Sequence, residues 1–247
     1  MKHFRLTGII IFCLFIGLQL CFVSKAQQPQ NPLKSESYSC ARGDNSLFIE
    51  YPVSGNAAFL DSVRSWINSG LGDSYKGSLN DGKALFDHYA DSIVYNTELD
   101  EYDGCETDSI SVEYQTEKFV TYNASGYWYG GGAHGMFYSL GRSFLFSNGD
   151  CFGYDCFSSL DELNVLVREA FKKNYGFTSD QEFCDSFFLQ SIDDFHLPEW
   201  DPWLTAKGIE FRFSLYESGA YAEGLRDVVI SYDVIKSYLN SKGLSFF

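Results

Sequence analysis

The segment Tyr127–Gly135 holds the first residues whose types and spacing could do chemistry. Tyr127, Trp128 and Tyr129 are followed by three glycines, an alanine and His134. Three aromatic rings beside a mobile turn and a histidine could form a platform on which a sugar ring stacks. The same residues could instead form a structural strand crossing in which the rings cover bare glycine. We favour the structural interpretation, because glycine within strands usually marks a bulge or a close approach.

A second candidate segment contains Glu217 and Tyr221 and lies between two predicted strands. A carboxylate at a strand end could act as a general acid or base, and a glycosidase pairs it with a second carboxylate. Because the chain has 33 acidic residues, a second carboxylate is always available and the pattern is not specific. The favoured alternative is a loop fixed by tyrosine hydroxyls and by a carboxylate that accepts backbone N–H groups. No hydrolase, metalloprotease or dinucleotide-binding motif is present.

Five cysteines follow residue 26, and in an oxidising compartment such thiols tend to pair. Cys151 and Cys156 are spaced to close a small loop, so they form the first predicted disulfide. Cys40 with Cys105 is the second prediction, which leaves Cys184 free. The spacing fits no zinc pattern, and the sequence predicts neither a metal site nor a cofactor.

Periodicity predicts which elements must position these residues. Helical periodicity places Phe59, Val63 and Ile67 on one face and predicts a second helix over 81–93. Ser159 opens another helix with a capping box, and a closing helix begins at Tyr232. Strands are predicted over the ranges 46–53, 110–115, 119 onward, 137–145, 209–215 and 227–231. The predicted class is α+β, with antiparallel sheets, helices packed on one face and two closely associated subdomains.

The N-terminus has the pattern of a secretory signal peptide. Lys2 and Arg5 precede an apolar run over 6–23, and small residues occupy the cleavage positions. An uncleaved membrane anchor and lipidation at Cys21 are the alternatives. All three outcomes predict that the folded part lies outside the cytoplasm, joined through a polar linker over 27–39.

The net charge narrows the class of partner. The whole chain carries −15, and without the first 26 residues the remainder has 15 basic and 33 acidic residues, or −18. This balance argues against a nucleic-acid binder, because phosphate binding requires a basic face. The 45% hydrophobic and 18% aromatic content argues against a disordered chain. A chain this acidic would attract a basic partner.

The order of five motifs is similar to one known family. They are the Tyr129–Gly135 segment, the helix from Ser159, the strand and loop over 209–217, the stretch 221–224 and the stretch 229–232. In this order they resemble the RsiV-type extracellular domain. That domain of unknown function forms the outer part of the RsiV anti-sigma factor and precedes the catalytic domain of the PdaC peptidoglycan deacetylase. The resemblance covers about 127–239, and the Tyr-Pro-Val at 51–53 resembles its smaller companion module.

The resemblance implies an α+β fold at the cell envelope. In RsiV this region captures lysozyme, and in PdaC it accompanies an enzyme that acts on peptidoglycan. No established catalytic residues transfer to this chain. The deacetylase domain is absent and only Met1–Arg5 precedes the apolar run, so we expect no sigma-factor inhibition. The predicted organisation is a signal peptide over 1–26, a linker over 27–39, a companion module over 40–121 and the RsiV-type domain over 122–247.

Three functional hypotheses follow. The favoured one is a non-catalytic extracytoplasmic binding module whose ligand is an envelope glycan or a basic, lysozyme-like protein. The alternative is a glycan-active hydrolase that uses Glu217 with His134, and the third is a purely structural protein. We expect membrane contact only through the N-terminal segment. The candidate ligand-binding residues are Tyr127, Trp128, Tyr129, His134, Glu217 and Tyr221.

Overall fold

The computed structural model describes residues 33–97 and 103–247. The predicted signal peptide, Cys21 and the first part of the predicted linker lie outside the described residues. Among the described residues, no helix is long and apolar enough to cross a membrane.

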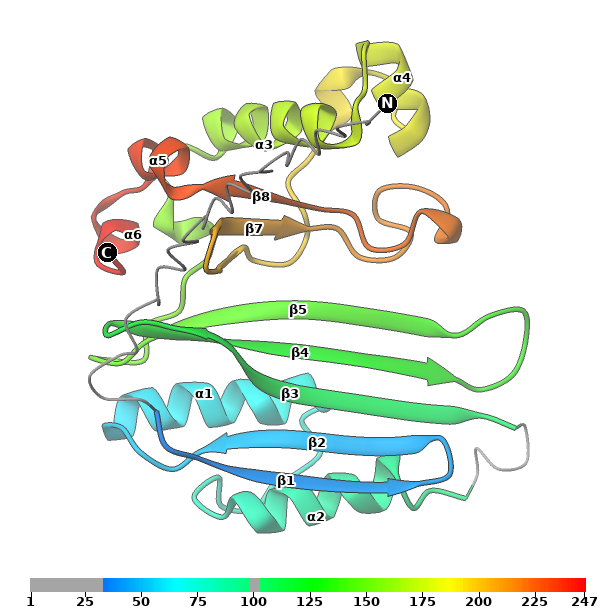
Figure 1. Ribbon diagram of the computed structural model, residues 1–247, viewed down its shortest axis with the longest axis vertical. Coiled ribbons are helices and arrows are strands. Elements are labelled where there is room, and N and C mark those ends of the chain that lie inside the picture. Colours follow the sequence, from blue (N-terminus) through cyan, green and yellow to red (C-terminus); the bar gives the residue numbers. More distant parts are fainter. Residues whose placement is uncertain (1–32, 98–102) are drawn as a thin grey trace, which may run out of the picture.

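A five-stranded sheet dominates the N-terminal part of the molecule (Figure 1). Its strands run in the order β1-β2-β3-β4-β5, and they are β1 (Ser35–Arg42), β2 (Asn45–Pro52), β3 (Cys105–Gln115), β4 (Phe119–Tyr129) and β5 (Met136–Leu145). Neighbouring strands are antiparallel except β2 and β3, which are parallel. The parallel pair arises because α1 (Ala57–Gly70) and α2 (Gly82–Ile93) form the crossover between these two strands.

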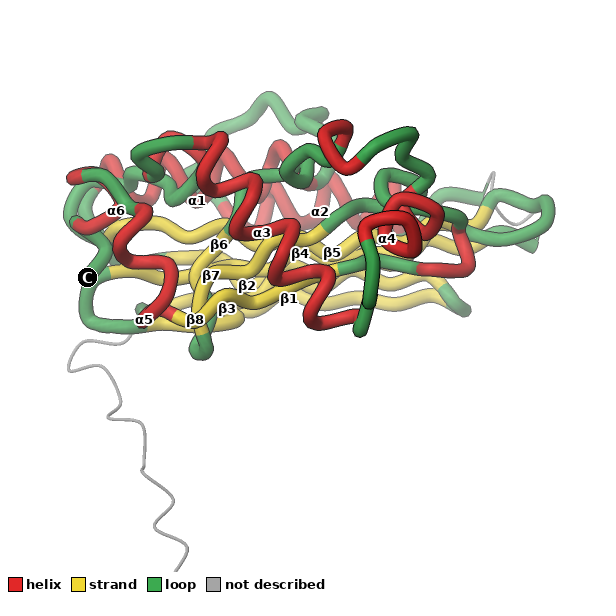
Figure 2. The backbone as a smooth tube through the Cα atoms, turned by 90° about the horizontal axis from the view of Figure 1, so that it is seen from above, coloured by secondary structure: helices red, strands yellow, loops and turns green. Residues whose placement is uncertain are grey.

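Both crossover helices cover the same face of this sheet (Figure 2). Asn56 caps α1 by accepting the N–H of Phe59, and Asp81 caps α2 in the same way. Leu47 and Ile49 of β2 point toward the helices and are fully buried with the predicted apolar face of α1. The apolar side chains that alternate along the strand and those that recur every 3.6 residues along the helices therefore pack into one core.

The C-terminal part combines three short strands with four helices. These elements are α3 (Leu160–Tyr175), α4 (Asp180–Phe187), β6 (Trp203–Leu204), β7 (Gly208–Arg212), β8 (Asp227–Ser231), α5 (Tyr232–Ile235) and α6 (Ser241–Leu244). The strands form an antiparallel sheet in the order β6-β7-β8. Its core is rich in phenylalanine, and Phe171 packs against Phe187 and Phe213 with ring centroids 6.0 and 5.3 Å apart.

The two sheets meet at a buried cluster of hydroxyl groups. Thr121 of β4 donates a hydrogen bond to the carbonyl of Leu204 at 2.7 Å, and Ser143 of β5 accepts the N–H of Leu204 at 2.9 Å. The two hydroxyls bond to each other at 2.7 Å. Both backbone groups of Leu204 in β6 are thus satisfied by side chains of the five-stranded sheet, so the two parts are held in a fixed relation.

The predicted α+β class is confirmed, but several predicted boundaries are wrong. The boundary between 121 and 122 divides β4, a central strand of the five-stranded sheet, so the N-terminal unit extends beyond β5. The predicted linker ends too late, because β1 already begins at Ser35. The predicted strand over 209–215 ends at Arg212. The helix α4 was not predicted.

Neither predicted disulfide forms, since all five cysteines among the described residues are free thiols. Cys151 packs against the N-terminal core, whereas Cys156 is buried in the C-terminal core. Cys40 and Cys105 lie on β1 and β3, with β2 between them. Strands in that relation are roughly 9–10 Å apart, which exceeds the span of a disulfide.

Candidate functional site

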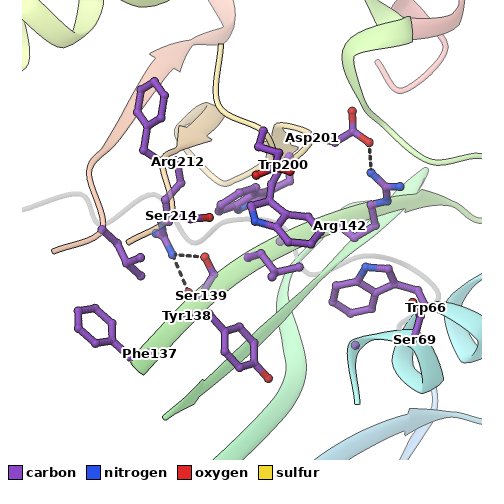
Figure 3. A pocket seen from close by; sticks show the side chains of 17 residues that line it. Trp66, Ser69, Phe137, Tyr138, Ser139, Arg142, Trp200, Asp201, Arg212 and Ser214 are labelled. Carbon is purple, nitrogen blue, oxygen red and sulfur yellow. Dashed lines mark hydrogen bonds and ion pairs between the residues drawn. The ribbon is translucent and has the colours of Figure 1, made fainter. Parts of the chain in front are cut away.

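A groove runs between the five-stranded sheet and the loops of the C-terminal unit. It consists of two adjoining cavities of about 510 and 390 Å³. Both are lined by Phe137, Tyr138, Glu199, Trp200 and Ser214. We call the larger cavity the inner part of the groove and the smaller one the outer part. In Figure 3 the Trp200 side chain lies among the residues of the inner part, between Ser214 and Arg142.

Strand register builds the floor of the outer part. Glu106 of β3 lies opposite Trp128 of β4, which lies opposite Met136 of β5. In the next row on the same face, Asp108 lies opposite Gly126, which lies opposite Tyr138. Because side chains two residues apart point to the same face, these two rows present a continuous surface.

Gly126 leaves room for a hydrogen bond within this floor. The Tyr138 hydroxyl donates to Asp108 Oδ1 at 2.6 Å. A Cβ atom at Gly126 would lie 2.1 Å from that carboxylate oxygen and 2.6 Å from the Tyr138 ring. Any side chain at position 126 would therefore displace both groups.

The two acidic side chains of the floor are perturbed by their surroundings. Burial raises the pKa of Glu106, and the charge of Asp108 raises it further. Burial also raises the pKa of Asp108, and the hydrogen bond from Tyr138 opposes this effect. Both groups therefore hold a proton more readily than an exposed carboxylate does.

The inner part of the groove contains paired charges. Arg142 of β5 forms an ion pair with Asp201, drawn as a dashed line in Figure 3. Arg212 of β7 donates to the Ser139 hydroxyl at 2.6 Å and also pairs with Glu210. These contacts connect β5 to the C-terminal unit and leave little net charge in this part of the groove.

Two indole rings are presented to solvent in the groove. Trp200 is 51% exposed and Trp128 is 48% exposed, although both line a cavity. A third tryptophan, Trp66 at the end of α1, lines the inner part. Half-exposed indoles in a concave surface are suited to bind flat apolar faces of a ligand.

Glu217 holds one wall of the groove but does not line it. Its two carboxylate oxygens accept the N–H of Glu199 at 2.6 Å and the N–H of Ser214 at 2.7 Å. Glu199 and Ser214 both line the groove, so Glu217 fixes the relation between the Trp200 loop and the end of β7. This agrees with the favoured interpretation of Glu217 as a carboxylate that orders a loop, because each oxygen accepts a backbone N–H from a different segment.

His134 and Tyr221 come together, but in a separate cluster at the tip of the β4–β5 hairpin. Their rings stack with centroids 3.7 Å apart. His134 Nε2 lies 3.0 Å from the Tyr216 hydroxyl, and the Tyr221 hydroxyl donates to the Gly135 carbonyl at 2.8 Å. His134 Nδ1 lies 3.1 Å from the same carbonyl. A neutral imidazole with its proton on Nδ1 satisfies both contacts, so the polar atoms of this cluster are used within the protein.

The three aromatic residues predicted as one platform are split between two faces of β4. Trp128 lies in the row that forms the groove floor, whereas Tyr127 and Tyr129 lie in the opposite row because strand side chains alternate. Tyr127 nevertheless contributes to the lining of the outer part, and Tyr129 lines neither part. The Tyr127 ring covers Gly135 and the Trp128 ring covers Gly130, since a Cβ at either glycine would lie 2.5 Å or less from the ring. The Tyr129 hydroxyl donates to the Gly132 carbonyl at 3.0 Å.

Most groove residues escaped sequence reasoning. Glu106 and Asp108 sit in an alternating polar strand that gave no motif, and Tyr138 was seen only as part of a strand. Trp200 lies in the stretch 198–203, whose two prolines and two tryptophans form a local signal that could have been used. Among the described residues, no cluster of three or more His, Cys, Asp or Glu side chains could hold a metal ion.

Comparison with solved structures identifies the fold. A member of the DUF3298 family from Bacteroides fragilis matches with a TM-score of 0.71 and 18% identity, over 88% of this chain and 98% of the other. A DUF3298 protein from Pseudomonas aeruginosa matches with a TM-score of 0.55 and 15% identity, over 88% and 97% of the two chains. No family sequence model and no curated protein matches the chain. The chain therefore has the fold seen in DUF3298 proteins, a domain of unknown function.

Proposed function

We propose that the protein is a non-catalytic, extracytoplasmic module that binds a glycan of the bacterial cell envelope in the groove. The observation that carries the proposal is the pair of half-exposed indoles, Trp128 and Trp200, in a cavity between rigidly joined units. Indole faces stack on the C–H faces of sugar rings, and the carboxylate, hydroxyl and guanidinium groups of the groove can bond to sugar hydroxyls.

The geometry favours binding over hydrolysis at the residues predicted for catalysis. Glu217 uses both oxygens on backbone N–H groups, and the ring nitrogens of His134 are engaged by Tyr216 and Gly135. A general acid or base must reach the scissile bond of the substrate, and neither residue lines the groove. We therefore infer that these two residues order the loops around the site.

The envelope location and the RsiV-type relationship form part of the same proposal. They are supported by the signal-like N-terminus and by the order of sequence motifs, while the likeness to solved structures extends to the fold. The acidic character of the chain also suits a basic, lysozyme-like protein. We favour the glycan because the conspicuous feature of the site is a concave aromatic groove, a shape that admits an extended chain of sugars.

The test is binding of purified peptidoglycan and of its soluble fragments, measured by co-sedimentation and calorimetry. We expect the wild-type protein to bind and the double variant Trp128→Ala/Trp200→Ala to lose binding. His134→Ala, outside the groove, is the matched control and should bind normally. Binding of lysozyme without any binding of glycan would overturn the proposal, as would turnover of the glycan by the wild-type protein.

A further inference from the structure

The outer part of the groove has an unbalanced charge. Its lining contains three carboxylates, those of Glu106, Asp108 and Glu199, and no lysine, arginine or histidine among the described residues. None of the three forms an ion pair with another described residue. A ligand that reaches this part of the groove therefore meets negative charge without a compensating cation.

The inner part does not share this property. Arg142 is paired with Asp201 there, and Arg212 is paired with Glu210. The groove thus has one end with balanced charge and one end with excess negative charge, and the two ends share Trp200 in their linings. A ligand that occupies both parts would be selected for positive charge at one end only.

Aromatic rings and carboxylates in one cavity are suited to bind an organic cation. The faces of indole rings attract ammonium groups, and carboxylates accept their N–H donors in charge-assisted hydrogen bonds. Trp128 lies directly opposite Glu106 in the β3–β4 register, so an indole and a carboxylate are adjacent by construction. In the neighbouring row, Gly126 lies opposite Asp108 and has no side chain that would cover this carboxylate.

The surroundings of the two floor carboxylates agree with this arrangement. Both lie two residues apart on one strand face, and burial raises the pKa of each, while the charge of Asp108 adds to the rise for Glu106. A cation bound between them would lower both pKa values, because an opposite charge favours the ionised carboxylate. The Tyr138 hydroxyl holds Asp108 in place for such a contact.

We propose that the outer part of the groove binds the protonated amine of an amino sugar, so that the module prefers a glycan with free amino groups to its N-acetylated form. This inference rests on the proposed function of the groove as a glycan site. A sugar ring supplies the apolar face for the indoles, and its ammonium group supplies the positive charge for the carboxylates. An N-acetyl group is neutral and donates one N–H where the ammonium group donates three.

The experiment compares glucosamine tetrasaccharide with N-acetylglucosamine tetrasaccharide by calorimetry, in a slightly acidic buffer that keeps the amine protonated. Both sugars are titrated into the wild-type protein and into the double variant Glu106→Gln/Asp108→Asn. Asp108→Asn retains an oxygen for the Tyr138 hydroxyl. Asp233→Asn is the control, because Asp233 is an exposed carboxylate on α5, at the other end of the sheet from the β4–β5 hairpin (Figure 1).

We expect the wild-type protein to bind the free-amine sugar about tenfold more tightly or better, in line with hydrogen bonds to charged groups. The double variant should lose this preference while its affinity for the N-acetylated sugar stays within about twofold. The control should keep the preference.

Each other outcome has a definite meaning. Equal binding of both sugars by the wild-type protein, or an unchanged preference in the double variant, overturns this inference and leaves the proposed function standing. Absence of binding to both sugars and to peptidoglycan overturns the proposed function itself. A tetralysine peptide is added as a competitor. If it binds the groove more tightly than the free-amine sugar does, the inference is overturned in favour of a basic protein segment as the ligand.

Discussion

The groove and the hairpin-tip cluster are both aromatic, but they differ in how their polar atoms are used. At the hairpin tip, His134, Tyr216 and Tyr221 satisfy one another and the Gly135 carbonyl. In the outer part of the groove, the carboxylates of Glu106 and Glu199 have no ion-pair partner among the described residues, and two indoles face solvent. The contacts at the tip therefore stabilise the structure, whereas the groove has groups available to bind a ligand.

The comparison shows that residue type alone does not distinguish a binding site from a cluster that only stabilises the fold. Both regions combine aromatic rings with titratable groups, and the tip has the more conspicuous sequence. The distinguishing property is the unused capacity for hydrogen bonding and ion pairing in a concave surface, because groups already satisfied by the protein gain little from a ligand.

The largest expected effect is on the groove aromatics. Truncating both Trp128 and Trp200 removes two half-exposed indoles, and from the apolar area that a ligand would cover we expect a loss of about 2–4 kcal/mol in binding free energy. Calorimetry with peptidoglycan fragments measures this loss. Circular dichroism should show an unchanged fold, because neither ring is part of a core. Retention of full affinity would remove the distinction between the two regions.

The next largest effect concerns the carboxylate that orders the groove wall. Glu217→Ala leaves the N–H groups of Glu199 and Ser214 without their acceptor, and we expect a decrease of about 2 kcal/mol in the free energy of unfolding. Glu217→Gln keeps one acceptor oxygen, so its free energy of unfolding should lie between those of Glu217→Ala and the wild type. Urea denaturation measures both. An unchanged stability together with loss of a glycan-hydrolysing activity would instead support the catalytic alternative.

A third prediction concerns pH and the buried Glu210 beside the groove. Burial raises the pKa of Glu210 to about 7, with Asp227 and Glu113 adding to the effect and Arg212 opposing it. The folded state therefore binds the proton more tightly than the unfolded state. The resulting stabilisation is fully present below the unfolded pKa near 4.5 and is lost as the pH rises through about 7.

As the pH rises from 5 to 8, we therefore expect the deprotonation of Glu210 to lower the free energy of unfolding by roughly 1–2 kcal/mol. Chemical denaturation across this range measures the slope, and Glu210→Gln should flatten it. An identical slope in the variant would show that other carboxyl groups cause the pH dependence.

The smallest expected effect is at the hairpin tip. Tyr216→Phe removes one exposed hydrogen bond, and we expect a change below about 0.5 kcal/mol in stability. His134→Ala removes two hydrogen bonds and the stack on Tyr221, and we expect a change of up to about 1 kcal/mol. Tyr216 also has a left-handed backbone with φ of 67°, which neither variant relieves. Glycan affinity should stay at the wild-type value. A tenfold loss of affinity in His134→Ala would move the binding site from the groove to the tip.

Much of the fold could be predicted from local patterns. The helices α1 and α2, the capping of α3 by Ser159 and the strand at 137–145 all followed from periodicity or from capping residues. The unpredicted parts depend on distant contacts. The parallel pairing of β2 with β3 follows from the helical crossover, and the domain boundary failed because β4 continues without a break across 121 and 122.

The site was predictable only in part. Alternation along β4 implies from sequence alone that Trp128 faces away from Tyr127 and Tyr129, so a single platform of all three was never compatible with a strand. The glycines covered by aromatic rings agree with the structural interpretation. The disulfide prediction failed because sequence separation says nothing about which core a cysteine enters.

The sequence by itself determined the class of fold, the element positions and the acidic, aromatic composition, because these depend on neighbouring residues and on simple sums. Only the tertiary structure decided which aromatic residues face a cavity and which carboxylates lack a partner. Trp128 meets Glu106 through strand register and Trp200 through the docking of two sheets, and both are long-range relations. The physical reason is that a binding site consists of polar and aromatic groups that have no partner within the folded protein. Which groups these are is decided only when all the long-range contacts have formed.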